Sequence, residues 1–169
     1  MNKTWLSAFF CLFLSMNVAA QVSKTTLCQQ EEIMIASCQI DENLKRILSI
    51  CSSGDRKSIA YRFGTESKIE MEVDFSRHRR VSRWDDSWTH TIHFGFRNGE
   101  YGYIFGVPQE TYGAKAFLDV TKGDTLIKSS QCLENSFGEK ALLSEAIVEI
   151  PDAAVRGSGF IFPPKLDQK

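Results

Sequence analysis

Short stretches of alternating apolar and polar residues recur along this chain, and they constrain its fold more than any other feature. Residues 68–75 (KIEMEVDF) alternate without interruption, with Ile69, Met71, Val73 and Phe75 on one face and charged residues on the other. Because successive side chains of a strand point to opposite faces, this segment predicts a strand with one buried and one solvated face. Similar stretches separated by turn residues predict four hairpins: 31–40 with 45–52, 57–63 with 68–75, one within 89–107, and 115–121 with 125–132.

The third of these hairpins carries the clearest turn signal, the pair Asn98-Gly99. This pair favours a two-residue turn in which both central residues have positive φ. A turn centred there pairs Phe96 with Tyr101, Phe94 with Tyr103 and Ile92 with Phe105. The opposite face then holds Gly95, Gly102 and Gly106, where the missing side chains permit sharp bending or the close approach of another segment.

The C-terminal part of the chain changes to a helical period. Ser136 and Glu139 match a capping box, apolar residues recur at helical spacing from Leu142 to Ile150, and Pro151 follows. We therefore predict one helix at about 137–150 that docks on the sheet or over a barrel mouth. About eight short antiparallel strands with tight links tend to curl and hide their edges. The expected fold class is mainly β: an antiparallel barrel or flattened barrel of about eight strands with one C-terminal helix.

The first twenty residues have the layout of a secretory signal peptide. Lys3 is followed by an apolar run from Trp5 to Met16, and small residues precede a cleavage point after Ala20. The run is shorter than the roughly twenty residues that span a membrane. We predict a signal peptide at 1–20 and a single disulfide-linked β domain at 21–169, located in the periplasm or secreted, with no transmembrane segment.

Four cysteines remain after this cleavage, and an even number in an oxidising compartment predicts two disulfides. In the first hairpin, a turn at 41–44 places Cys51 opposite Met34 and separates it from Cys38 by four residues, roughly 13 Å along the strand. That separation exceeds the roughly 7 Å between Cα atoms that a disulfide tolerates. Of the three possible connectivities we favour Cys28–Cys51 with Cys38–Cys132, and sequence alone leaves the others open.

The charge balance excludes a general nucleic-acid binder. The whole chain has a formal net charge of −1, and the loss of Lys3 with the leader changes it to −2. Nucleic-acid-binding domains carry a basic surplus that this chain lacks.

One window, residues 76–93 (SRHRRVSRWDDSWTHTIH), holds all three histidines of the chain. Arginine and tryptophan are enriched at interface hot spots, and arginine also suits bidentate contact with a carboxylate or phosphate. We therefore predict a partner-binding loop that uses Arg77, Arg79, Arg80, Arg83, Trp84 and Trp88. The alternative is a structural role, in which Asp85 and Asp86 pair with the arginines and the tryptophans cap the core.

Other chemistries find little support in the sequence. His90 and His93 would point to opposite faces of a strand, so they do not share a metal ion easily with Asp85 or Asp86. No G-x-S-x-G motif is present, and Glu70 with Glu72 fit a solvated strand face better than a pair of catalytic acids. We predict no cofactor, no metal and no enzymatic activity.

Two resemblances to exported bacterial proteins follow from these residues. The stretch ASCQIDENLKRILSICSS, followed by YRFGTESKIEMEV, resembles an uncharacterised family of small periplasmic proteins with the same order of Cys, Cys, Y-R-F-G and I-E. The eight-strand pattern, an early cysteine and TKGDTLIKSSQC resemble, more loosely, the periplasmic inhibitors of c-type lysozyme. Those are small antiparallel barrels with a disulfide from an early strand to the last. Their S-G-x-x-Y loop has no clear counterpart here, so no inhibitory residue is assigned.

Together these observations predict an exported protein that binds rather than catalyses. The leading hypothesis is an inhibitor or immunity-type protein that blocks a cell-wall-attacking enzyme by presenting loop 76–90 to a protein partner with an acidic surface or a cleft. A second hypothesis is an envelope accessory protein that binds lipid or glycan in a barrel mouth lined by Phe94, Phe96, Tyr101 and Tyr103. A third is a hydrolase with an unrecognised site. The sequence does not predict an oligomeric state.

Overall fold

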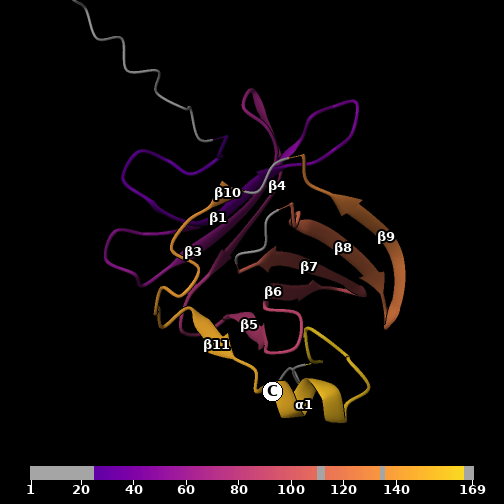
Figure 1. Ribbon diagram of the computed structural model, residues 1–169. Coiled ribbons are helices and arrows are strands. Elements are labelled where there is room, and N and C mark those ends of the chain that lie inside the picture. The colour runs from indigo at the N-terminus through magenta and orange to yellow at the C-terminus, as the bar shows by residue number, and fades with distance from the viewer. Residues whose placement is uncertain (1–24, 110–112, 134–135, 166–169) are drawn as a thin grey trace, which may run out of the picture.

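The computed structural model describes residues 25–109, 113–133 and 136–165, and the chain in this part is mainly β (Figure 1). The predicted signal peptide lies outside the described residues. The first sheet has the order β10-β1-β2-β3-β4, formed by Ser136–Phe137, Ile33–Gln39, Ile47–Ser52, Ile59–Thr65 and Lys68–Phe75. The second has the order β11-β5-β6-β7-β8-β9, formed by Ile147–Glu149, Val81–Asp86, Thr91–Asn98, Tyr101–Pro108, Phe117–Lys122 and Thr125–Gln131. The four predicted hairpins are present, and the mainly β fold class is confirmed.

The two sheets join along one side only, so the expected barrel does not close. At the end of β9 the chain crosses to the first sheet: Asp41 donates its backbone N–H to Gln131 at 2.8 Å, and Leu133 donates to Gln39 at 2.8 Å. The Cys38–Cys132 disulfide crosses the same junction. On the other side β4 and β5 are consecutive in the chain but do not pair. Instead β11 pairs in parallel with β5, and thereby occupies the edge that a closed barrel would offer to β4.

Both sheets contribute side chains to one apolar core. Phe96 on β6 meets Tyr61 on β3 at a centroid distance of 4.8 Å and Phe75 on β4 at 5.2 Å, both edge to face. It also stacks on Tyr103 of β7 at 5.1 Å. Phe94 is 1% exposed and Phe96 is 5% exposed. The second hypothesis placed Phe94, Phe96, Tyr101 and Tyr103 at a ligand-binding barrel mouth. This placement is wrong for the two phenylalanines, which fill the space between the sheets, whereas Tyr103 is partly buried and Tyr101 is 38% exposed.

The β6–β7 hairpin turns one residue later than predicted. Phe96 faces Tyr103 and Phe94 faces Phe105, so the two loop residues are Gly99 and Glu100. Gly99 has a φ of 60° at the first loop position, as a type II′ turn requires. The faces of the strands are unaffected, because the predicted and observed partners of each residue are two positions apart on the same face.

The glycine face of this hairpin is covered by another segment, as the sequence suggested. A Cβ atom on Gly95 would lie 2.6 Å from the ring of Phe162, and one on Gly106 would lie 2.1 Å from the ring of Phe117. Residues 158–165, which we call the C-terminal arm, cross this outer face. Arg97 fixes the arm by donating from Nε to the carbonyl oxygen of Pro163 at 3.0 Å.

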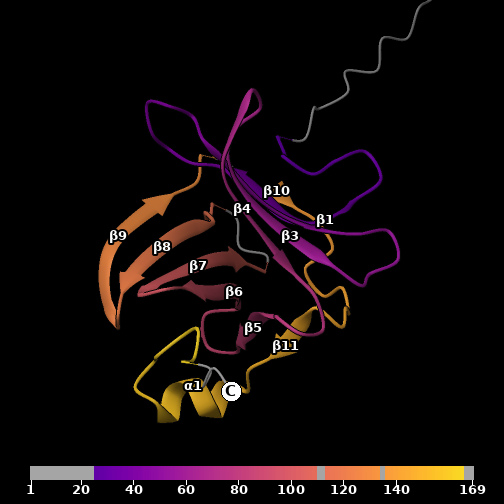
Figure 2. The same cartoon turned by 180° about the vertical axis from the view of Figure 1, so that it is seen from behind.

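The predicted helix at 137–150 is wrong. The chain there forms β10, turns and β11, and the helix α1 spans Asp152–Gly157, directly after Pro151. The run from Ile147 to Ile150 is rich in β-branched residues, which fit a strand better than a helix. Proline was interpreted as the end of a helix, but it is equally compatible with a helix start, where its missing N–H is not needed. Figure 2 shows α1 beside β5, at the edge of the second sheet.

Within the described residues, no helix is long and apolar enough to span a membrane.

Candidate functional site

The predicted partner-binding window does not form one loop. Its middle, Val81–Asp86, is the strand β5, which separates a turn at 76–80 from a turn at 87–90. A strand of six residues spans roughly 20 Å, so the two turns lie at opposite ends of the sheet. The six predicted binding residues therefore fall into three groups with different surroundings.

The first group, Arg83 and Trp84, is buried inside the molecule. Arg83 is 8% exposed and donates from Nη1 to the carbonyl oxygens of Lys140 at 2.9 Å and Leu142 at 2.8 Å. Its Nε donates to Glu149 at 2.7 Å. Trp84 is 6% exposed and donates from Nε1 to Asp152 at 2.9 Å. Both residues hold the chain after β10 against β5, so their assignment to a partner-binding surface is wrong.

The second group, Arg77, Arg79 and Arg80, is exposed in the turn at 76–80. Arg79 lies over the ring of Phe75 at 5.6 Å from its centroid, and Arg77 donates from Nε to His78 at 3.0 Å. None of the three pairs with Asp85 or Asp86, so the alternative interpretation of the window is wrong on this point. Asp86 binds Arg156 instead, and Asp85 accepts from Gln109 at 2.9 Å.

The third group is Trp88, which is 76% exposed and does not stand alone. The guanidinium of Arg156 on α1 lies 4.0 Å from the centroid of the Trp88 ring and 5.4 Å from that of Phe160, which is 60% exposed. We call this set of Trp88, Arg156 and Phe160 the Trp88–Phe160 site. A cation between two aromatic rings fixes both by cation–π attraction.

Two carboxylates hold the Trp88–Phe160 site in place. Asp152 accepts from Nε of Arg156 at 2.9 Å, and Asp86 pairs with Nη2 of the same guanidinium. Asp86 also accepts from the backbone N–H of Trp88 at 3.0 Å and from the hydroxyl of Thr89 at 2.8 Å. Asp86 thus binds both the turn at 87–90 and Arg156, whose guanidinium contacts the ring of Trp88.

These contacts also explain the ionisation of both acids. Burial raises the pKa of Asp86, but the hydrogen bonds from Thr89 and Trp88 and the charge of Arg156 outweigh it, so its pKa lies below the usual value. The side-chain hydrogen bonds from Arg156 and Trp84 lower the pKa of Asp152. Both carboxylates are therefore charged at neutral pH, as their contacts with Arg156 require.

The backbone at Phe160 is unusual for an aromatic residue. Its φ is 66°, in the left-handed region that bulky side chains rarely adopt. The preceding Gly159 has a φ of 74°, and the Phe160 N–H donates to Val155 at 2.8 Å to end the helix. A strained residue whose side chain is left in solvent stabilises no core, and strain of this kind concentrates at functional sites.

Neither Arg156 nor Phe160 stands out in the sequence. Phe160 and Phe162 are two positions apart in one apolar run, yet Phe162 is 5% exposed and Phe160 is turned outward. The sequence signal was Gly159, whose missing side chain permits the left-handed backbone directly before Phe160.

A cavity of about 890 Å³ lies on the other side of the turn at 87–90. Because Asp85 faces Ile92 across the β5–β6 ladder, it lies on the inner face of the sheet, whereas Asp86 lies on the outer face. We call this space the Asp85 cavity. Its lining includes Arg56, Asp85, His90, Gln109, Glu139 and Leu142.

The histidines occupy three separate environments. His78 is exposed in the first turn, His90 lines the Asp85 cavity with a φ of 51°, and His93 is packed on the outer face between Trp84, Phe117 and Phe162. His90 and His93 thus lie on different sides of the second sheet, as their spacing predicts.

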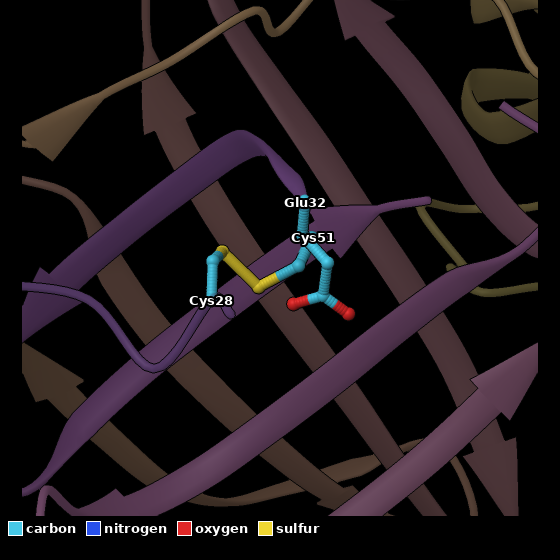
Figure 3. Close-up of side chains that lie close together, drawn as sticks. All are labelled: Cys28, Glu32 and Cys51. Carbon is cyan, nitrogen blue, oxygen red and sulfur yellow. A yellow bond between two sulfur atoms is a disulfide. The ribbon is translucent and has the colours of Figure 1, made fainter. Parts of the chain in front are cut away.

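One group of possible metal ligands occurs among the described residues, Cys28, Glu32 and Cys51 (Figure 3). The two sulfur atoms are bonded to each other, so neither offers a thiolate. Glu32 accepts from Arg62 through both oxygens, at 2.5 Å and 3.0 Å. This group is therefore a structural connection between the N-terminal segment and β2–β3. The Cys28–Cys51 and Cys38–Cys132 connectivity that we favoured is confirmed.

Comparisons of the chain with family models, with curated proteins and with solved structures find no match.

Proposed function

We propose that this protein is an exported binding protein that recognises a protein partner through the Trp88–Phe160 site. The observation that carries the proposal is an exposed tryptophan and an exposed phenylalanine held on either side of an arginine that two carboxylates fix. Tryptophan and arginine are the residue types that most often dominate the energy of protein interfaces.

Preorganisation supports the same conclusion. Binding immobilises side chains at a cost of about 0.5–1.5 kcal/mol for each rotamer-rich group. The Trp88 ring is already held by Arg156 and its backbone by Asp86, so little of that cost remains. The surrounding sheet is cross-linked by two disulfides, which limits rearrangement of the scaffold.

The cysteines and the leader sequence support an exported location. Disulfides persist in secreted and periplasmic proteins and are rare in the reducing cytosol. Together with the signal-peptide layout of residues 1–20, the two disulfides support export to the periplasm or beyond.

The more specific form of the proposal is an inhibitor or immunity-type protein that blocks a cell-wall-attacking enzyme. It rests on the resemblance to periplasmic inhibitors of c-type lysozyme. Trp88 and Phe160 then act as anchors that enter the cleft of the enzyme, in place of the arginines of the 76–80 turn.

Photo-crosslinking in the producing organism tests the binding site. A benzophenone amino acid at position 88 is expected to cross-link one dominant protein, whereas the same group at position 44 is not. Leu44 is a suitable control because it is 61% exposed in a different hairpin loop. Equal yields at both positions, or no cross-linked protein at either, would refute the site.

The captured protein then tests the specific function. If it is a wall hydrolase, the wild-type protein should inhibit it, and Trp88→Ala should weaken binding by about 30-fold, the effect of a hot-spot residue worth about 2 kcal/mol. Arg79→Glu with Arg80→Glu should leave binding within about threefold of the wild type. If the charge variant alone loses binding, the 76–80 turn is the site and our assignment is wrong.

A further inference from the structure

The Asp85 cavity lies between two regions that are far apart in the sequence. Asp85, His90 and Ile92 come from the β5–β6 hairpin, and the opposite wall is the segment 138–143. Its volume of about 890 Å³ is in the range of sites that enclose small-molecule ligands. It is separate from the Trp88–Phe160 site, because residue 85 is on the inner face of the sheet and residue 86 is on the outer face.

The walls of this cavity are held by polar contacts. Arg83 binds the carbonyl oxygens of Lys140 and Leu142 and so fixes the segment 138–143. The Lys140 ammonium donates to the carbonyl oxygens of Pro108 at 3.2 Å and Gln109 at 2.8 Å. The Gln109 amide then donates to Oδ1 of Asp85 at 2.9 Å. This chain of contacts joins both walls, so the cavity is a formed part of the fold.

Charged groups of both signs line the cavity without pairing to each other. Asp85 and Glu139 supply carboxylates, and Arg56 supplies a guanidinium. In the part of the chain that the structure describes, none of these three side chains takes part in an ion pair. They are exposed and therefore able to meet a ligand. Between them lies an apolar floor, since Ile92 is 7% exposed and Leu142 is 5% exposed.

This lining selects one kind of ligand. An ammonium group is favoured beside Asp85 and Glu139, and a carboxylate is favoured beside Arg56, whose planar group can bind both of its oxygens. A fatty acid or an anionic sugar would offer no cation to the two carboxylates. A neutral glycan would offer no opposite charge to any of the three groups as it displaced their water. An aliphatic side chain suits the floor of Ile92 and Leu142.

We propose that the Asp85 cavity binds a short peptide with a free ammonium and a free carboxylate. Asp85 receives the ammonium, Arg56 receives the carboxylate, and an aliphatic side chain of the peptide lies on Ile92 and Leu142. This site goes beyond the protein-binding function proposed above and does not depend on it.

The experiment uses nitrogen-15-labelled, disulfide-bonded protein and the dipeptide Leu-Ala as the probe, followed by NMR titration. We expect saturable shifts of amide signals in 90–92 and 138–143. N-acetylation of the peptide should weaken its affinity by at least about fivefold, and C-terminal amidation should do the same, because each cap removes one ion pair worth about 1 kcal/mol.

Two variants test which side chain binds each end of the peptide. Asp85→Asn should weaken Leu-Ala but leave the acetylated peptide unchanged, and Arg56→Ala should weaken Leu-Ala but leave the amidated peptide unchanged. Glu100→Gln is the control, because Glu100 is an exposed carboxylate in the β6–β7 turn. Trp88→Ala should bind the dipeptide normally, which separates this site from the protein-binding site.

The proposal is overturned if shifts are absent at millimolar dipeptide or spread over the surface. It is also overturned if the capped peptides bind as well as the free one, since the charges of Asp85 and Arg56 would then have no role in binding.

Discussion

The indole ring of Trp84 lies flat on the imidazole of His93, with ring centroids 4.4 Å apart and an interplanar angle of 17°. Phe117 and Phe162 enclose the imidazole from two further directions, and its Nε2 is buried and has no hydrogen-bond partner among the described residues. Burial lowers the pKa of His93 from 6.5 to about 4, although the charges of Asp86 and Asp85 oppose this shift. The buried imidazole is therefore neutral at physiological pH.

This contact predicts a pH-dependent loss of stability. Between pH 6.5 and about 4 the unfolded chain binds a proton at His93 that the folded protein does not, so the free energy of unfolding falls as the pH falls. The full shift corresponds to about 3 kcal/mol. Urea denaturation from pH 7.5 to 4 should show this loss in the wild type and not in His93→Phe. Parallel curves for the two proteins would contradict it.

The two disulfides should contribute unequally to stability. Cys38–Cys132 closes a sequence separation of 94 residues and Cys28–Cys51 one of 23. In the chain-entropy treatment these loops correspond to about 4–5 and about 3 kcal/mol. Replacing both cysteines of each pair by alanine should therefore lower the guanidinium midpoint more for the Cys38–Cys132 pair. The opposite order would show that the junction between β1 and β9 is held by other contacts.

Arg83 should be irreplaceable even by lysine. Its fork binds two carbonyl oxygens and Glu149 at once, which a single ammonium cannot reproduce. We expect Arg83→Lys to lower the free energy of unfolding by about 1.5–3 kcal/mol, the range for hydrogen bonds to charged groups. Amide exchange in 139–143 should become faster. Arg80 is exposed and directly precedes β5, so Arg80→Lys should be neutral within about 0.5 kcal/mol.

A single methyl group added at position 95 should displace the C-terminal arm. A Cβ atom at position 95 would lie 2.6 Å from the Phe162 ring, so Gly95→Ala should displace the arm and destabilise the protein by about 1–3 kcal/mol. Proteolysis within 158–165 should accelerate. Addition of Phe162→Ala should make the Gly95→Ala change nearly neutral in that background. Gly157→Ala is the matched control, because no atom of the described part of the chain lies within 4 Å of its added Cβ.

Local sequence patterns predicted the strands of the four hairpins, but they missed β5, β10 and β11 and did not predict how far each segment is buried. The hairpins follow from alternation and turn residues, which act over a few neighbouring positions. The register of the first hairpin shows the limit: Cys51 faces Met34 as predicted, but a bulge between Met34 and Ala36 places Cys38 opposite Leu48 instead of Ile47. The bulge moves the register by one residue without changing the disulfide.

The candidate site also shows that a local sequence pattern does not predict burial. Trp84 and Trp88 are the same residue type, four positions apart in one polar window, yet one is 6% and the other 76% exposed. Their exposure differs because the C-terminal arm and α1 cover Trp84 on the outer face of β5. These covering segments lie about seventy residues further along the chain. No local pattern around position 84 encodes that cover.

By itself, then, the sequence determined the strand-rich fold class and the four hairpins, because side-chain period and turn chemistry are local properties, and it favoured one cysteine pairing without excluding the others. Only the tertiary structure decided that the sheets stay open between β4 and β5, that Arg83 and Trp84 are internal, and that Trp88, Arg156 and Phe160 meet. Those outcomes depend on where β11, α1 and the C-terminal arm pack. β11 occupies the edge of β5 that β4 would need in a closed barrel, and α1 with the C-terminal arm covers the outer face of β5. Such packing between distant segments cannot be read from a local pattern.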